Sequence, residues 1–261
     1  MTTLLSFLSG LKYFGFIMLA IAMLLVLVVI HEFGHYTAGK LLKFKINEFS
    51  VGFGPKIFQI TKKNGELFTL RWLPLGGYCA FEGEDGTSDN PQAFNKQKPW
   101  KRLIVLFCGP LFNFLSAFVF SFIYLLAIQH YSVWHALAQC VPYTFEWTGV
   151  ILKILGQFFT GQLAFLDVFA GPASGIKMIA EASQIGLRVF LILTVVLSIN
   201  LGIFNLVPFP ALDGCQMLFT LIEMIIRRPI NRKVIDWVNT IGLFVLLAFV
   251  VVVDILQFAL R

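Results

Sequence analysis

Charged residues are scarce in this sequence, and their scarcity is the first indication of its class. Asp, Glu, Lys and Arg together make up 13% of the 261 residues, while hydrophobic residues make up 58%. A soluble domain carries roughly a quarter charged residues. The apolar residues also gather in long blocks without any charge. The composition therefore excludes an ordinary soluble domain and favours an integral membrane protein.

Cysteine pairs are missing as well. The four cysteines, Cys79, Cys108, Cys140 and Cys215, are scattered and show no C-x-x-C spacing. A cysteine-based zinc site or disulfide framework would need a recognisable spacing of these residues. We therefore expect the four side chains to be unpaired, small apolar fillers.

Four apolar runs are long enough to cross a bilayer, which takes about 20 mostly apolar residues. They predict spans near 13–38, 103–128, 187–207 and 236–257. The first run is not expected to be a cleaved signal peptide, because residues 1–10 contain no basic residue and the run ends in His-Glu. The predicted fold class is an all-α polytopic membrane protein with about four transmembrane helices.

The distribution of the net charge of +6 predicts how the chain is oriented. Eleven of the 20 Lys and Arg residues lie between Lys40 and Arg102, after the first span, and four more lie at 227–233, after the third. By the positive-inside rule, both basic segments face the cytoplasm and both termini lie outside. The same charge attracts anionic lipid headgroups. No soluble basic face is visible, so we expect no nucleic-acid partner.

The segments between the spans predict two smaller elements. Residues 44–80 are rich in β-branched and aromatic residues, and Asn64-Gly65 stands between "KIFQITKK" and "ELFTLRW". This dipeptide favours a type I′ hairpin turn, so we predict a small membrane-associated antiparallel sheet beside the first span. Residues 150–160, beyond the second span, have the pattern of a short amphipathic interfacial helix.

The stretch "VVIHEFGHYTAGK" places an H-E-x-x-H motif at the end of the first span. Spacing of i and i+4 on a helix puts His31 and His35 on one face, where both can bind one zinc ion. Glu32 lies on the flank of that face and could take a proton from zinc-bound water without being a ligand. A solvated helix end is the alternative, but ionisable groups inside a membrane are costly and usually functional.

A catalytic zinc ion takes a third protein ligand, and few residues in apolar context could supply it. Asp213 is the best candidate because it follows Pro208 and Pro210, where the broken helix must line a cavity or pack in protein. An N-cap for the following helix is an equally good explanation of this aspartate. His130 and His135 follow the second span on the opposite side and are expected to be ordinary interfacial residues.

The H-E-F-G-H motif together with "NLVPFPALDG", residues 205–214, resembles the site-2 protease family of intramembrane zinc metalloproteases. That family pairs H-E-x-x-H with a distant N-x-x-P-x-P-x-L-D-G. The further stretches "FSVGFGPKIF", "PLGGYCAFEGED", "GPLFNFLSA" and "GPASGI" are similar to the bacterial subgroup that trims anti-sigma factors and leftover signal peptides. The resemblance covers nearly the whole chain.

The resemblance implies a role for each matching residue. His31, His35 and Asp213 would be the zinc ligands, and Glu32 the general base. Asn113 and Asn205 would hold or polarise the substrate backbone near the metal. The sheet would pair with an extended substrate by β-augmentation. One departure is notable, because the 58 residues from 129 to 186 are too few for the PDZ domain that this subgroup usually carries. A C-terminal nucleotide-sensing (CBS) domain is not expected either.

The sequence thus predicts a single membrane-embedded peptidase domain over 1–261. It would be a Zn²⁺ metalloendopeptidase of a bacterial inner membrane that cleaves within or near the transmembrane helix of its substrates, close to the cytoplasmic side. Its partners would be transmembrane-helix substrates and the lipid bilayer. Two other classes are considered. A non-proteolytic module would only capture helices, and an ion transporter would use His31, Glu32 and Asp213 as a relay.

Overall fold

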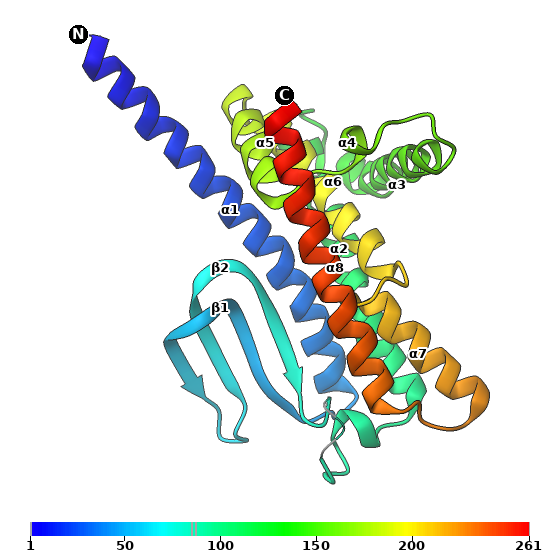
Figure 1. Ribbon diagram of the computed structural model, residues 1–261. Helices are drawn as coiled ribbons and strands as arrows, with labels where there is room; N and C mark the ends of the chain where they lie inside the picture. The colour runs from blue at the N-terminus through cyan, green and yellow to red at the C-terminus, as the bar shows by residue number, and fades with distance from the viewer. Residues whose placement is uncertain (1, 85, 87, 261) are drawn as a thin grey trace. The chain divides into compact units, whose positions relative to one another are not determined.

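The structure is a computed structural model that describes residues 2–84, 86 and 88–260 (Figure 1). Most of it is helical, with one small sheet. The helices are α1 (Thr2–Leu41), α2 (Pro99–Ala127), α3 (Val133–Phe159), α4 (Phe165–Val168), α5 (Pro172–Ile185), α6 (Leu187–Leu206), α7 (Asp213–Ile226) and α8 (Arg232–Leu260). The strands are β1 (Ile46–Thr61) and β2 (Leu67–Phe81), and a 3₁₀ helix spans Phe94–Lys96.

Four of the described helices are long and apolar enough to cross a membrane. They cover Ser9–Leu41, Pro99–Ala127, Leu187–Leu206 and Arg232–Ala259. The predicted fold class, an all-α polytopic membrane protein with a small sheet after its first helix, is confirmed. The protein is an integral membrane protein.

The chain forms two compact units, and each of the four long helices contributes to both. Unit 1 comprises the chain up to Met23, Ser116–Asn200 and the chain from Leu246 onward. Unit 2 comprises Leu24–Leu115 and Leu201–Val245. All of the residues singled out above as site candidates belong to unit 2.

The sheet of unit 2 is formed by two long antiparallel strands that both bend (Figure 1). Residues 48–51 of β1 pair with 77–80 of β2 on one side and with 67–70 on the other. Gly52 lies at the bend with φ +86°, and a Cβ there would lie 2.8 Å from the Leu73 carbonyl oxygen. The last part of β2, around Cys79, is therefore one edge of the sheet.

The β hairpin lies where Asn64-Gly65 predicted it, but the predicted turn type is wrong. Gly65 has φ +83°, whereas Asn64 is not among the described residues with positive φ, and type I′ requires both. The Gly65 N–H donates to the Lys62 carbonyl at 2.9 Å, which closes a turn of a different type. Asn64 accepts the Glu66 N–H at its Oδ1 and so forms a local side-chain turn instead.

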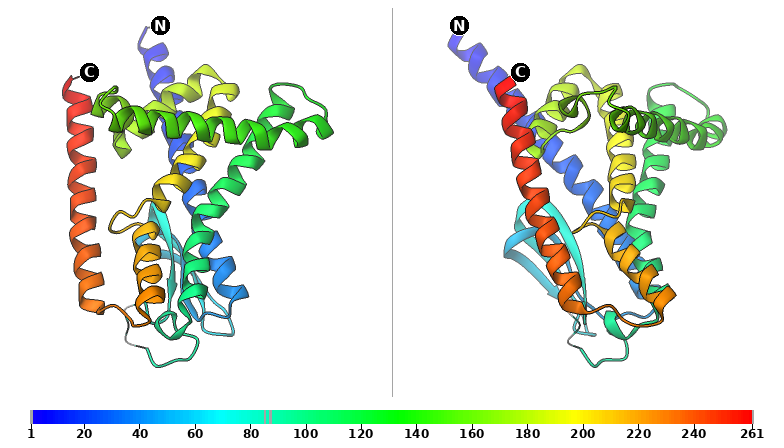
Figure 2. Two further views of the ribbon diagram at one scale, coloured as in Figure 1. Left: turned by 90° about the vertical axis from the view of Figure 1, so that its right-hand side faces the viewer. Right: turned by 45° about the vertical axis from the view of Figure 1, so that its right-hand side comes forward.

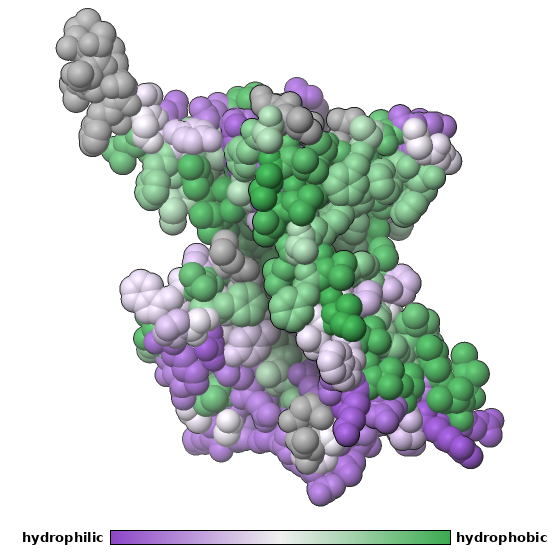
Figure 3. All heavy atoms as spheres, viewed as in Figure 1, coloured by the Kyte–Doolittle hydropathy of each residue, from purple (hydrophilic) through white to green (hydrophobic). Residues whose placement is uncertain are grey.

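The core of unit 2 joins the sheet to the last part of α1 and the first part of α2. Its buried members all have apolar side chains. They are Ala38, Phe44, Ile46, Phe49, Cys79, Phe81, Phe94, Val105 and Leu106. The surface of the loop after β2 and of the turn between α7 and α8 is hydrophilic (Figure 3). All four cysteines are free.

Unit 1 contains α3, which corrects the short interfacial helix expected at 150–160. The helix begins at Val133, where the Ser132 hydroxyl accepts the His135 N–H, and it has 27 residues. It runs across the C-terminal part of α2 (Figure 2). Thr144 lies on its buried face, with its hydroxyl 2.8 Å from that of Ser121 of α2. Residues 150–160 are thus the end of a longer helix packed on α2.

Candidate metal centre

The last part of α1 places two imidazoles side by side within unit 2. His31 and His35 lie one helical turn apart and are 5% and 7% exposed. Their Nε2 atoms are 3.2 Å apart. The i, i+4 spacing on one helix face therefore brings both rings to the same point, as expected.

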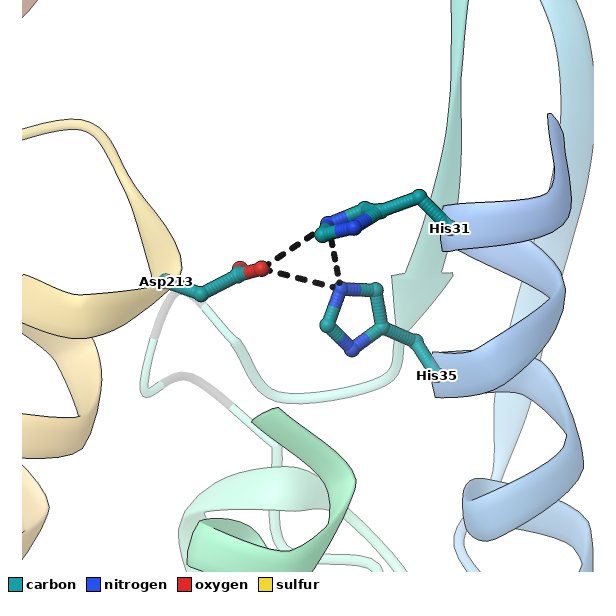
Figure 4. Close-up of side chains that lie close together, drawn as sticks. All are labelled: His31, His35 and Asp213. Atoms are coloured by element: carbon teal, nitrogen blue, oxygen red, sulfur yellow. Dashed lines mark hydrogen bonds and ion pairs between the residues drawn. The ribbon is translucent and has the colours of Figure 1, made fainter. Parts of the chain in front are cut away.

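Asp213, at the start of α7, completes a three-residue cluster (Figure 4). Its Oδ2 lies 2.9 Å from Nε2 of His31 and 3.2 Å from Nε2 of His35. Each residue can offer one ligand atom, and these atoms all lie within 4.8 Å of one another. In Figure 4 the carboxylate and both rings point toward one another from two helices.

The alternative explanation of Asp213 as a helix N-cap does not fit the structure. The N-cap of α7 is Leu212, and Asp213 is the first helical residue.

The break between α6 and α7 is tightly packed. A Cβ on Gly214 would lie 2.3 Å from the Val207 carbonyl oxygen, and one on Gly242 of α8 would lie 2.0 Å from Pro210. The carboxylate is therefore held toward the histidines by the packed segment between α6 and α7.

Each histidine has a partner on its other ring nitrogen. Nδ1 of His35 lies 2.8 Å from the Val105 carbonyl oxygen. A carbonyl can only accept, so Nδ1 carries a proton, and in the neutral ring Nε2 keeps its lone pair for a metal. The side chain of Asn113, fully buried on α2, donates from Nδ2 to Nδ1 of His31 at 2.9 Å. Rotating the Asn113 amide by 180° would instead place its oxygen beside Nδ1 of His31. That oxygen could then accept a hydrogen bond from an Nδ1–H.

Glycines let α1 and α2 approach each other at this point. A Cβ on Gly109 would lie 2.3 Å from Nε2 of His35 and 2.9 Å from Cε1 of His31. A Cβ on Gly34 would lie 2.2 Å from the Cys108 carbonyl oxygen. No larger residue fits at Gly109 unless the imidazoles move. Gly109 is thus part of the wall of the cluster.

Glu32 lies beside the cluster and contacts the sheet. Its Oε2 accepts the backbone N–H of Cys79 at 3.0 Å. Cys79 belongs to the edge segment of β2, so its N–H points out of the sheet toward α1. This contact and the Val105 carbonyl involve backbone groups, which leave no signal in the residue types. The sequence therefore pointed to Glu32 but not to its partner.

Asn205 is placed differently from the other candidates. Its Nδ2 donates to the Leu201 carbonyl on its own helix, α6, at 2.9 Å. The structure thus brings His31, His35, Asp213, Glu32 and Asn113 together, but it does not join Asn205 to their hydrogen bonds. His130 and His135 belong to unit 1 and are exposed, and the ring of His135 packs against that of Tyr131.

The donor set fits a zinc ion. Two imidazole nitrogens and one carboxylate oxygen are a usual set of three protein ligands in catalytic zinc sites, which keep one further position open. His35 donates its second ring N–H, as metal-bound histidines almost always do, and His31 would do the same with the Asn113 amide turned so that its oxygen faces Nδ1. An apolar membrane protein with such a cluster and a glutamate beside it belongs to the class of membrane metallopeptidases.

Comparison with known proteins agrees with this class. The model of peptidase family M50 matches residues 19–249, and the chain belongs to that family. A candidate zinc metalloprotease of Clostridium perfringens is 27% identical over 92% of this chain and 97% of its own length. One of Clostridium acetobutylicum is 26% identical over 92% and 96%. One of Neisseria meningitidis serogroup A is 44% identical over 36% of this chain and 22% of its own.

Two consequences follow from the comparison. The chain is a zinc metalloprotease of the site-2 protease family, as the sequence predicted. The alignment to the Clostridium perfringens protein extends over 328 residues, more than the 261 of this chain, so that relative contains residues without a counterpart here.

Proposed function

We propose that His31, His35 and Asp213 hold the zinc ion and that Glu32 is the general base of peptide hydrolysis. The observation that carries this proposal is the convergence of the three ligand atoms at the buried end of α1, with Glu32 next to them. When bound, zinc supplies Lewis-acid polarisation of the scissile carbonyl and a more acidic water molecule. The chain's own residues perform the remaining tasks.

Glu32 would move the proton. One of its oxygens, Oε2, is held by the Cys79 N–H, so the carboxylate is fixed in orientation and its other oxygen can take a proton from the attacking water. The same oxygen would then return the proton to the leaving amide nitrogen. General acid–base catalysis of this kind contributes about 10²- to 10⁴-fold to the rate.

The edge of the sheet would bind the substrate in extended form. A peptide bond within an intact helix is shielded, so the helix must unwind before hydrolysis. Residues 77–81 form an edge of the sheet beside Glu32. The Cys79 and Phe81 N–H groups already donate to Glu32 and Glu84, so an extended peptide could add by backbone hydrogen bonds to the part of this edge that precedes Cys79. We therefore propose transmembrane-helix proteins as substrates, of the anti-sigma-factor or remnant signal-peptide type.

Asn113 would act on the metal ligand, in place of the substrate contact that the resemblance implied. It is fully buried and its amide lies on Nδ1 of His31, so it would hold the ring and its tautomer. For Asn205 we retain substrate binding as the proposal. By the charge distribution, the metal centre would lie toward the cytoplasm and both termini outside.

The test uses the full chain in liposomes with a single-span helical substrate. Glu32→Gln should lower the cleavage rate at least a hundredfold while the zinc content, measured by atomic absorption, stays near one ion per chain. Glu181→Gln, the same change at an exposed glutamate of α5, should leave the rate unchanged. Cleavage by the Glu32 variant at the wild-type rate would show that the proposed mechanism is wrong.

The products also test the substrate assignment. Mass spectrometry should place the cut in or near the substrate helix, toward its cytoplasmic end. If only soluble peptides were cleaved and helical substrates were left intact, the protein would still be a metalloprotease but not an intramembrane one. Metal-dependent ion flux without cleavage would favour the transporter class.

A further inference from the structure

A basic pocket lies in unit 2 at the start of the candidate spanning helix α2. It has a volume of about 510 Å³ and is lined by the start of α2, the end of α7 and the turn that follows α7. The candidate span of α2 begins at Pro99, which lines the pocket, so the pocket lies at one end of that span. A volume of this size is in the usual range for small-molecule sites.

The floor of the pocket is electrically neutral. Glu223 of α7 is 6% exposed and forms an ion pair with Arg102 of α2. Its other oxygen, Oε1, accepts the Ile230 N–H at 2.9 Å. Both carboxylate oxygens are therefore occupied, and Arg102 and Glu223 cancel each other's charge.

The rim of the pocket carries the net charge. Arg227 and Arg228 both line it and are exposed. Within residues 2–84, 86 and 88–260, neither has an acidic partner within 4.0 Å. Arg227 is also the C-cap of α7, with φ 53° and ψ 28°. Glycine is the usual residue in this left-handed conformation, so an arginine there is unusual.

The rest of the lining includes the polar side chains of Asn95 and Gln97 as well as apolar ones. Trp100 is 45% exposed and Met224 is 42% exposed, and both line the pocket. Tryptophan at the end of a spanning helix is typical of the headgroup level of a bilayer. The pocket thus joins two arginines without acidic partners to an apolar wall at the membrane boundary.

We propose that this pocket binds the phosphate of an anionic phospholipid. Arginine can form paired hydrogen bonds to phosphate oxygens, and Trp100 and Met224 would contact the glycerol and the first part of the acyl chains. Basic pockets between transmembrane helices on the cytoplasmic side are known to take acidic headgroups. Phosphatidylcholine carries a compensating cation and would gain less from the two arginines.

The site would act on the same helix as the metal centre. Asp213 is the first residue of α7, whereas Glu223 lies in its last turn and Arg227 is its C-cap. A lipid held at the C-terminal end of α7 would therefore stabilise the helix that presents the carboxylate. The binding itself does not depend on the proposed peptidase activity and can be tested without it.

The test measures lipid binding to the detergent-solubilised full chain by native mass spectrometry. Phosphatidylglycerol should bind as a discrete adduct about tenfold more tightly than phosphatidylcholine with the same acyl chains. Arg227→Gln/Arg228→Gln should lower the phosphatidylglycerol affinity at least fivefold, since each basic residue near anionic lipid is worth roughly fivefold. The matched control is Lys43→Gln/Lys63→Gln, which removes two exposed basic side chains outside the pocket and should change the affinity less than twofold.

Three results would overturn the proposal. They are equal affinity for both lipids in the wild type, equal losses in the two double variants, and inorganic phosphate binding as tightly as phosphatidylglycerol. If the arginine double variant does not fold, Arg228→Gln alone takes its place, because Arg228 lies beyond the C-cap of α7. The single variant should then lower the affinity about fivefold.

Discussion

Nδ1 of His31 lies 2.9 Å from the buried amide of Asn113, although the two residues are 82 positions apart in the chain. Nδ1 of His35 also has a partner on α2, the Val105 carbonyl at 2.8 Å. Both rings of the H-E-x-x-H motif are thus held from behind by α2. For His35 the partner is a backbone group, which substitution does not remove, so the His31 contact is the one that mutation can test.

Asn113→Ala should weaken zinc binding without abolishing it. Loss of a partner behind a metal-bound histidine typically costs 10- to 100-fold in metal affinity. Competition with a chromophoric chelator measures the affinity directly and does not depend on peptidase activity. Ser121→Ala is a suitable control, because Ser121 is an equally buried polar residue of α2 whose hydroxyl contacts Thr144 of α3. Unchanged zinc affinity in Asn113→Ala would refute the proposed role of Asn113.

Gly109→Ala should disrupt the metal centre by steric conflict. The added Cβ would lie 2.3 Å from Nε2 of His35, so the ligand ring or the backbone of α2 must shift. We expect loss of most bound zinc and of activity, measured as metal content after dialysis and as cleavage rate.

Gly149→Ala and Gly156→Ala on α3 are matched controls for this change. A Cβ at either position meets nothing within 4 Å. Alanine is the better helix former, so these two variants should be neutral or slightly more stable, by up to about 1 kcal/mol. If the Gly109 variant keeps one tightly bound zinc ion, α2 can shift enough to accommodate the added Cβ, and the steric prediction is wrong.

The sequence predicts the parts of the site that depend on local geometry. His31 and His35 share a helix face because of their spacing alone, and the spans follow from the length of the apolar runs. Asp213 is 182 residues from His31, and its own surroundings left an N-cap equally possible. Only the packing of α7 near α1 distinguishes the two. The Val105 carbonyl and the Cys79 N–H could not be predicted because every residue type carries these groups.

Two local expectations failed for identifiable reasons. The first half of α3 was missed because it is apolar both on the side of Cys140, which is buried, and on the side of Trp134, which is 81% exposed. With apolar residues on both sides, the helical spacing of the buried residues does not stand out in the sequence. The hairpin turn differs from type I′ because Asn64 uses its side chain to bind Glu66, a competing local interaction that the dipeptide rule ignores.

Glu223→Gln should destabilise the protein by about 3–5 kcal/mol, because it removes one charge of a buried ion pair and leaves Arg102 uncompensated. Denaturant unfolding in detergent measures the change. Lys177→Ala, which breaks an exposed pair with Glu181, should cost at most about 1 kcal/mol. Arg102→Met/Glu223→Leu should recover much of the loss. If the double variant were no more stable than Glu223→Gln, the single variant's effect would not arise from an uncompensated charge.

Glu84, in the turn after β2, should make stability depend on pH. Burial raises the pKa of Glu84 to about 7, although its hydrogen bond from the Phe81 N–H opposes the shift. The folded state therefore binds this proton more tightly than the unfolded state, whose pKa is near 4.5. The free energy of unfolding should fall as the pH rises from about 4.5 to 7, and the full cost should persist at pH 8.

Glu84→Gln should remove this cost. Its free energy of unfolding should exceed that of the wild type by about 1–3 kcal/mol at pH 8 and by less at pH 5. Glu48→Gln is a control of opposite sign. Burial alone would raise the pKa of Glu48, but hydrogen bonds from Thr69 and Arg71 outweigh it and hold the pKa below its usual range. That variant should therefore be less stable than the wild type at both pH values. A difference between Glu84→Gln and the wild type that is the same at pH 5 and pH 8 would show that Glu84 does not titrate in this interval.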